Sequence, residues 1–297
     1  MSRRVIGVAI IAIWAVGLGM LYRRNVMRTP EQRLTEAGLR VSPASYYYIL
    51  QQNDRQVGAA ASSLDTTTTR VVSVDFIRGA VPVGKDTLRI EARSEARYSR
   101  GLRLQDFLIR ADGDLTPFTL RGVVQEGDTK TLRVTADTKG EKPILLDAVP
   151  LHAVFLPTMA PVPLMLRKEP RVGDSVMVSM YDPVGRTLRE VALTLQRDSL
   201  FLIVDSASLD SASGRWVKAR QDSVRGWRLG GANAPLTAWV DASGRLLAAS
   251  EPGGISLVRT AFELAFENWR IDNPNSARPN LSVGRIPRRM SRASSIR

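Results

Sequence analysis

No feature of this sequence constrains the fold more than the alternation of apolar and charged side chains between Leu88 and Tyr98. Successive side chains of a β-strand point to opposite faces, so the pattern predicts a long strand with one wet side. Because the charges alternate in sign, they suit ion pairs with neighbouring strands better than a binding patch. The apolar face carries Leu88, Ile90, Ala92, Ala96 and Tyr98, and the charged face carries Arg89, Glu91, Arg93, Glu95 and Arg97.

Shorter alternations of the same kind recur along residues 45–272, and Gly-containing turn signals such as Gly173-Asp174 and Ser213-Gly214 separate many of them. Many strands at this spacing predict a mainly β protein with one large antiparallel curved sheet, either half-barrel-like or a two-part sandwich. The predicted strands are centred on Val72/Val74/Phe76, Leu132/Val134/Ala136, Val176/Val178/Met180, Val191/Leu193/Leu195 and Leu236/Ala238/Val240.

Residues 151–166 interrupt the strand pattern, because they are apolar and rich in proline, which a central strand excludes. One interpretation is a buried crossover that joins two halves of the sheet near residues 150–170. The other is an apolar lip for a lipid-like ligand, formed by Phe155, Met159, Leu164 and Met165.

A second interruption lies at residues 255–269, where apolar side chains recur at steps of three and four residues. This period predicts a helix that covers part of the sheet, with its aromatic side chains packed in the core. The apolar positions are Val258, Phe262, Ala265, Phe266 and Trp269.

The first apolar run, Val5 to Tyr22, lies between Arg3-Arg4 and Arg23-Arg24. As a helix it would be roughly 27 Å long, close to the thickness of a bilayer core. We expect residues 1–24 to be an uncleaved transmembrane signal-anchor; a cleaved signal peptide and a buried core helix are the alternatives. The anchor positions are Val5, Ile6, Ile10, Ile11, Ile13, Trp14, Val16, Leu18, Leu21 and Tyr22.

Residues 25–44 form the expected juxtamembrane helix and linker. Thr29 is suited to cap a helix, Pro30 to occupy its first position, and Gly38 to end it.

The net charge of +13 is concentrated at the two ends of the chain. Residues 1–44 contribute +5 and residues 273–297 contribute +6, which leaves +2 for the β region. A nucleic-acid-binding domain would carry its excess on a folded face, so we expect no nucleic-acid partner. Residues 273–297 are predicted to be a disordered basic tail, either simply solvated or attracted to anionic lipid head groups.

The composition argues against several kinds of active site. The chain has no cysteine and one histidine, His152, so thiolate chemistry and metal sites built on Cys or His are excluded. No Gly-x-Ser-x-Gly elbow or phosphate-binding glycine loop occurs, and Asp112-Gly113-Asp114 is typical of a turn. We therefore assign no catalytic residue, no metal ligand and no cofactor-binding residue, and expect no cofactor and no enzymatic activity.

Short motifs recur through residues 45–270: Tyr47-Tyr48-Ile49-Leu50, Val57-Gly58, Leu104 to Phe107, Gly173-Asp174, Tyr181-Asp182-Pro183, Trp239-Val240-Asp241, Gly244-Arg245-Leu246, Arg259-Thr260 and Glu263-Leu264-Ala265. With these motifs the region resembles an uncharacterised bacterial envelope domain, found alone or ahead of transglutaminase-like cores in exported proteins. The resemblance implies an extracytoplasmic β-rich fold akin to the curved half-barrels of lipoprotein carriers. It implies no catalysis, since those cores use Cys, His and Asp and this chain has no Cys.

Together these features predict a single-pass protein of a bacterial inner membrane, whose β domain lies in the periplasm. Two functions fit: a non-enzymatic envelope binding module for an apolar or lipid-like ligand, or a structural or adaptor domain that contacts another envelope protein. Besides the membrane, the expected partners are therefore a lipid or another envelope protein.

Overall fold

A computed structural model describes residues 30–83, 85–114, 117–125, 131–137, 144–146, 154–166, 169–183, 185–230, 237–251 and 254–273. Its strands are β1 (Ala44–Gln52), β2 (Arg55–Thr66), β3 (Arg70–Val83), β4 (Asp86–Ser99), β5 (Leu104–Gly113), β6 (Phe118–Gln125), β7 (Thr131–Ala136), β8 (Ile144–Leu146), β9 (Val154–Phe155), β10 (Ser175–Asp182), β11 (Thr187–Asp210), β12 (Arg215–Gly230), β13 (Thr237–Val240), β14 (Leu246–Ser250) and β15 (Ile255–Thr260). Its helices are α2 (Pro30–Arg40), α3 (Val162–Met165), the π-helix η1 (Glu263–Glu267) and α4 (Asn268–Asp272).

All fifteen of these strands belong to one sheet, in the order β8-β7-β6-β5-β4-β3-β2-β1-β15-β14-β13-β12-β11-β10-β9. Neighbouring strands are antiparallel except for the short β9, which pairs parallel to β10. The first and last strands, β1 and β15, pair in the middle of this order, whereas β8 and β9, successive in the chain, form its two ends. The sheet therefore consists of two runs of successive strands, β1 to β8 and β9 to β15, which join where the first strand pairs with the last.

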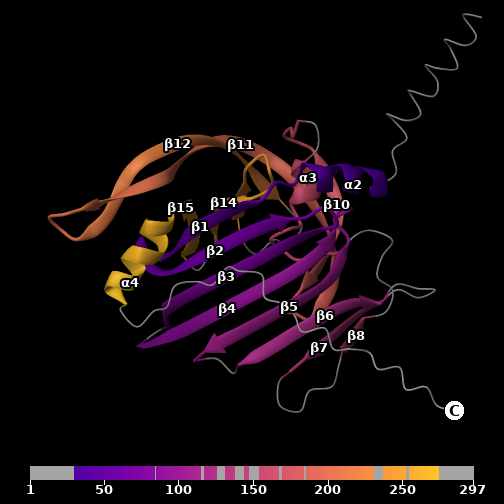
Figure 1. The fold of residues 1–297 in the computed structure, drawn as a ribbon, viewed down its shortest axis with the longest axis horizontal. Coiled ribbons are helices and arrows are strands. Elements are labelled where there is room, and N and C mark those ends of the chain that lie inside the picture. The colour runs from indigo at the N-terminus through magenta and orange to yellow at the C-terminus, as the bar shows by residue number, and fades with distance from the viewer. Residues whose placement is uncertain are drawn as a thin grey trace, which may run out of the picture.

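The sheet curls so that its two ends contact each other through the inner face. Phe107 of β5 packs on Tyr181 of β10, with ring centroids 5.1 Å apart. The same core cluster joins Leu132 and Val134 of β7 to Val178 of β10. Figure 1 shows β1 to β8 side by side, with β11 and β12 arching away from them. One continuous sheet, rather than two stacked sheets, thus encloses the main core.

The predicted alternations are confirmed as strands, and the charged face of β4 forms the expected cross-strand ion pairs. Arg78 of β3 pairs with Glu91, and Arg97 lies 3.6 Å from Asp106 of β5. Burial raises the pKa of Asp106, and the positive charge of Arg97 opposes that rise. The outer face of β4 is therefore occupied by ion pairs within the protein.

The helix predicted over residues 255–269 is wrong in its first part, because Ile255–Thr260 is the strand β15. β15 pairs with both β1 and β14, so its backbone hydrogen bonds are made across the sheet. Helical structure starts only with η1 at Glu263. The apolar spacing from Val258 to Phe262 thus crosses a strand end and is not a helical repeat.

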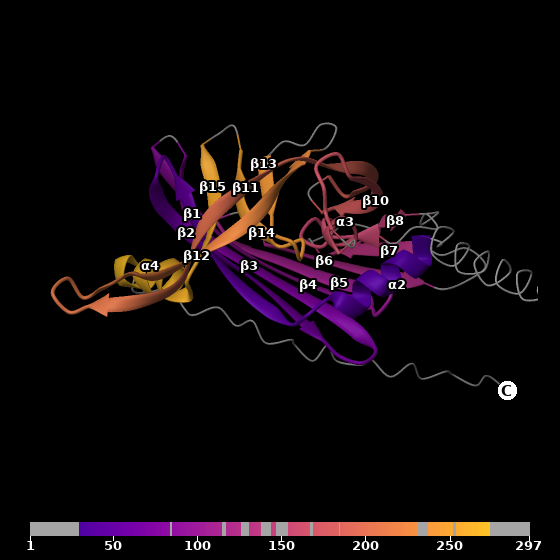
Figure 2. The same cartoon turned by 90° about the horizontal axis from the view of Figure 1, so that it is seen from above.

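η1 and α4 cover the outer face of the sheet, on the opposite side from the main core. Phe266 packs at the edge of Tyr47, with ring centroids 6.2 Å apart, and lies over Phe76 of β3. The long β11–β12 hairpin extends past α4 (Figure 2). Its tip is joined to α4 by the Arg215–Asp272 ion pair of 2.8 Å.

α2 begins at the expected Pro30 and continues two residues past Gly38 to Arg40. Its Ala37 and the following Val41 are buried in the main core. Within the described residues, no helix combines the length and apolar character needed to cross a bilayer. The predicted anchor, the linker before Pro30, His152 and the basic tail after Asn273 lie outside the described residues.

Candidate functional site

The curl of the sheet leaves a cavity of about 400 Å³ on its inner face. This volume falls within the range of about 300–1,000 Å³ that is usual for small-molecule pockets. Strands from both ends of the chain meet around it, and most of the side chains are apolar or small. The lining residues are Tyr48, Ala60, Ala61, Ser62, Asp75, Phe76, Ile77, Ala92, Ser94, Pro157, Thr158, Pro161, Leu229, Ala238, Val240, Gly244, Arg245, Leu246, Ala249 and Leu257.

The proline-rich segment from Val154 to Leu166 borders this cavity. Pro157 and Thr158 line it and are themselves exposed, which places them at its rim. A hydrogen bond joins this segment to β4: the N–H of Leu156 donates to the hydroxyl of Tyr98 at 3.1 Å.

The four predicted lip residues all lie in this segment, but they point into protein. Phe155, Met159, Leu164 and Met165 are each at most 1% exposed. None is among the residues that line the cavity. Their contact with a ligand stays a prediction, whereas their neighbours Pro157, Thr158 and Pro161 do border the cavity.

Asp75 is one of two charged side chains in the lining. Its carboxylate accepts hydrogen bonds from the hydroxyls of Ser62 at 2.6 Å, Thr158 at 2.9 Å and Ser94 at 3.3 Å. A longer contact of 3.4 Å joins it to Ser73. The four hydroxyls replace much of the hydration that a carboxylate would have in water.

The turn between β13 and β14 presses against the rim segment. Gly244 has φ +79°, and a Cβ at this position would lie 3.0 Å from the Cα of Val162. Asp241 opens the turn and accepts hydrogen bonds from the N–H groups of Ser243 at 2.8 Å and Arg245 at 3.0 Å. Glycine is thus required here both for its backbone conformation and for the close approach.

The carboxylate of Asp241 also forms an ion pair with Arg259 of β15. Arg259 Nη1 lies 2.7 Å from Asp241 Oδ2, and the guanidinium stacks 3.6 Å above the ring centroid of Tyr46. Both charges are mostly buried, so this pair fixes the turn to the central strands.

Arg245, directly after this turn, is the second charged residue of the lining, and it is only 4% exposed. Among the described residues, its guanidinium makes one hydrogen bond, from Nη1 to the sulfur of Met159 at 3.5 Å. A thioether is a weak acceptor, and arginine is almost never fully buried without an anionic partner. Tyr48 lies nearby; burial raises the pKa of its hydroxyl, so the hydroxyl is neutral at physiological pH.

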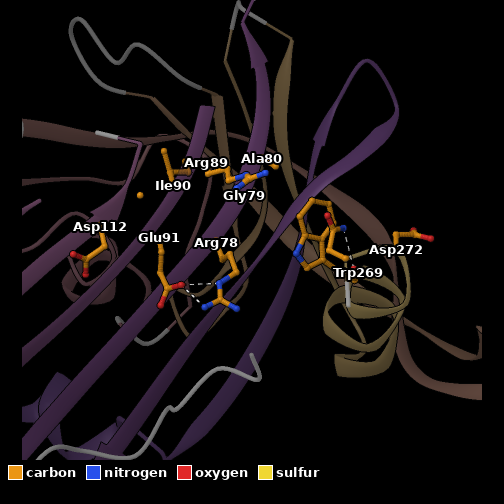
Figure 3. Close-up of a pocket in the computed structure, with 11 residues that line it drawn as sticks. Arg78, Gly79, Ala80, Arg89, Ile90, Glu91, Asp112, Trp269 and Asp272 are labelled. Carbon is orange, nitrogen blue, oxygen red and sulfur yellow. Dashed lines mark hydrogen bonds and ion pairs between the residues drawn. The ribbon is translucent and has the colours of Figure 1, made fainter. Parts of the chain in front are cut away.

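A second cavity, of about 480 Å³, lies on the outer face between β3, β4, β5 and α4. Figure 3 shows that its polar wall is the ion pair between Arg78 and Glu91, with Asp112 on one side and Trp269 on the other. Arg78 and Glu91 of this wall already pair with each other, and Asp272 pairs with Arg215, which favours the inner cavity as the binding site. Within the described part of the chain, no three His, Cys, Asp or Glu residues are grouped as a metal site would need.

Sequence reasoning did not single out Asp75 or Arg245 as functional residues. Arg245, Arg259 and Asp241 occur in the motifs of the resemblance, where no role was assigned to them. Their meeting in space depends on the pairing of β1 with β15, which no local pattern specifies. A lone arginine after an Asp-x-x-Gly turn was the only local signal.

Comparisons with known proteins support the fold. No protein-family model and no curated protein matches the chain. A crystal structure of a β-barrel-like protein of the domain of unknown function DUF1849 from Brucella abortus aligns with a TM-score of 0.51 and 10% identity, covering 73% of this chain and 95% of that one. A DUF1089 family protein from Pseudomonas aeruginosa aligns with a TM-score of 0.35 and 13% identity, over 66% of this chain and 90% of that one.

Proposed function

We propose that this protein is a non-enzymatic binding module that holds an apolar or lipid-like ligand inside the curl of its sheet. The observation that carries the proposal is the inner cavity of about 400 Å³, which the side chains of the described residues leave unfilled. A cavity lined mainly by apolar side chains gains little from water, whereas an acyl chain would bury its surface there at about 0.8 kcal/mol per methylene.

Native mass spectrometry of the full chain tests the proposal. The chain is purified in glyco-diosgenin, a rigid sterol detergent, and titrated with lauryl alcohol, an uncharged amphiphile. We expect one bound molecule per chain. Ala249→Leu adds three carbons to the wall and narrows the cavity, so it should weaken binding about tenfold.

The matched control is Ala248→Leu. Ala248 directly precedes Ala249 in β14, so its side chain points to the opposite face of the sheet. This variant should bind like the wild type. Equal loss in both variants, or the absence of any bound amphiphile in the wild type, would contradict the proposal.

We also propose that the apolar run Val5–Tyr22 tethers this module to the bacterial inner membrane, with the β domain in the periplasm. The support is the length of the run and its flanking arginines. A reporter fused after Arg297 tests the orientation: alkaline phosphatase activity is expected, and activity of a cytoplasmic reporter alone would contradict it.

An adaptor function is the second candidate, and the β11–β12 hairpin favours it. Leu200 and Leu202, which share one face of β11, are each 71% exposed. Exposed apolar side chains that lie together mark interaction sites more often than isolated ones do. A photo-crosslinking amino acid at Leu202 in intact membranes is the test: recurrent protein adducts support the adaptor, and their absence argues against it.

A further inference from the structure

The inner cavity contains a positive charge that the described protein does not neutralise. Arg245 lines the cavity, is 4% exposed, and has only the sulfur of Met159 as a hydrogen-bond acceptor for its guanidinium among the described residues. Arginine cannot lose its proton in a protein, so this charge persists in the empty cavity. Burial of an unpaired guanidinium is costly, and an anion at the same place would relieve that cost.

Asp241 is the carboxylate closest to Arg245 in sequence, but its oxygens are already occupied. Oδ1 accepts hydrogen bonds from the N–H and the hydroxyl of Ser243, at 2.8 and 2.5 Å, and from the backbone N–H of Arg245. Oδ2 accepts the 2.7 Å hydrogen bond from Arg259. Asp241 therefore shapes the turn and neutralises Arg259 instead of the Arg245 guanidinium.

Asp75 is the other carboxylate of the cavity, and it too has partners. It accepts hydrogen bonds from the hydroxyls of Ser62, Ser94 and Thr158. Within the described residues, no ion pair joins it to Arg245. The hydroxyls satisfy its oxygens, so Asp75 has little need for a cation, while Arg245 lacks an anion.

The other lining residues indicate which chemical group is attached to that anion. Five strands of the sheet each present a small or apolar side chain to the cavity: Ala60, Ala92, Ala238, Ala249 and Leu257. Such a surface favours a hydrocarbon chain over a polar body. The guanidinium presents a planar fork of N–H donors, which matches the two oxygens of a carboxylate or phosphate.

We infer that the ligand is an amphiphile whose anionic head group, a carboxylate or a phosphate, binds the Arg245 guanidinium while its hydrocarbon chain fills the cavity. This inference rests on the proposed function and adds the class of ligand. Pro157 and Thr158 at the rim are then the residues that the ligand passes as it enters.

Four amphiphiles with the same chain separate this inference from the proposed function. The full chain in glyco-diosgenin is titrated with laurate, lauryl phosphate, lauryl alcohol and dodecyltrimethylammonium, each below its critical micelle concentration, and binding is read by native mass spectrometry. We expect laurate, lauryl phosphate or both to bind about tenfold or more tightly than lauryl alcohol, as hydrogen bonds to charged groups allow. The stronger of the two anions identifies the head group.

Arg245→Met tests whether the preference comes from this residue, because methionine keeps much of the length and removes the charge. The variant should bind lauryl alcohol as well as the wild type does and lose the preference for the anion. Arg220→Met, on the exposed hairpin, removes the same charge away from the cavity and should change nothing. The ligand-free Arg245→Met chain should unfold at the same urea concentration or a higher one, since an unpaired buried charge has been removed.

Each outcome decides between the two claims. If all four amphiphiles bind equally, or if the anion preference survives in Arg245→Met, the inference is wrong and the cavity still binds apolar chains. Tightest binding of dodecyltrimethylammonium would overturn it in favour of a cation at Asp75. Binding of none of them would overturn the proposed function itself. If Arg245→Met does not fold, the comparison of the four ligands on the wild type still decides.

Discussion

The hydroxyl of Tyr98 is the residue-scale link between the sheet and the segment that borders the cavity. It accepts the hydrogen bond from Leu156 N–H, and its ring stacks on Phe155 with centroids 6.1 Å apart. Tyr98→Phe removes the acceptor and leaves a buried N–H unpaired, which typically costs about 1–3 kcal/mol. We expect that loss in the free energy of unfolding, measured by urea denaturation.

Tyr47→Phe is the matched control for this prediction. Tyr47 packs its ring on Phe262, and no described residue hydrogen-bonds its hydroxyl. Loss of the Tyr47 hydroxyl should change the free energy of unfolding by less than about 0.5 kcal/mol. Equal effects of the two substitutions would show that the Tyr98 hydroxyl does not hold the segment.

The ion pair at the hairpin tip gives a pH-dependent prediction. The hydrogen bond donated by Arg215 lowers the pKa of the Asp272 carboxyl below its ordinary value. A depressed folded-state pKa means that the pair stabilises the protein above the unfolded pKa of about 3.9 and that this stabilisation is lost as the pH falls through the folded pKa. Both side chains are about half exposed, so the effect on stability is small, about 0–1 kcal/mol.

Carbon-13 NMR titration of the carboxyl groups measures this directly. The Asp272 carboxyl should titrate below the ordinary aspartate range in the wild type and move up toward it in Arg215→Met. An unchanged Asp272 pKa in that variant would show that the hairpin tip is not joined to α4 in solution.

The charged residues of the cavity were the feature that the sequence predicted least well. Arg245 and Asp75 lie 170 positions apart in the chain and meet only because β1 pairs with β15. Absences were easier to establish, since a chain with no cysteine and one histidine rules out whole classes of site without any geometry.

At the scale of elements, α2 is positioned by a glycine that helix propensity alone would disfavour. A Cβ at Gly38 would lie 1.8 Å from the carbonyl oxygen of Arg100, a backbone atom that cannot rotate away. Alanine would gain about 1 kcal/mol in helix propensity, but overpacking against backbone costs about 1–3 kcal/mol. Gly38→Ala should therefore lower the urea midpoint.

Leu39→Ala provides the comparison, because Leu39 is in the same helix and 65% exposed. Its substitution should leave the midpoint nearly unchanged. A higher midpoint for Gly38→Ala than for the wild type would mean that α2 does not pack against the turn between β4 and β5.

The alternation of β4 was read correctly as a strand, whereas the partly buried β15 was predicted to be helical. β4 alternates because one face carries ion pairs, so its period is visible in the sequence. β15 lies between β1 and β14, with the aromatic side chains of η1 following directly, and its apolar residues merge with theirs into a helical spacing. Period alone cannot separate such a strand from a buried helix.

At the scale of the whole molecule, the order of strands makes the chain one folding unit. β1 and β15 pair in the middle of the sheet, and one core cluster joins Leu132 of β7 to Tyr181 of β10, near its opposite ends. Strands β1 to β8 and strands β9 to β15 share this core, so neither set can keep it without the other. The sequence indicated two halves joined near residues 150–170, but it contained no sign that the ends of the sheet pack together.

This continuity predicts a single unfolding transition. Trp269 of α4 borders β3 and β4, so it is replaced together with Trp14. In this Trp14→Phe/Trp269→Phe background the remaining tryptophans, Trp216, Trp227 and Trp239, report β12 and β13, whereas far-UV circular dichroism reports all strands. The two signals should coincide in urea. Leu132→Ala, at a fully buried position of β7, should lower both midpoints together, by about 2–5 kcal/mol in stability. A shift confined to circular dichroism would mean that the N-terminal strands unfold separately and that the cavity wall is built from two independent parts.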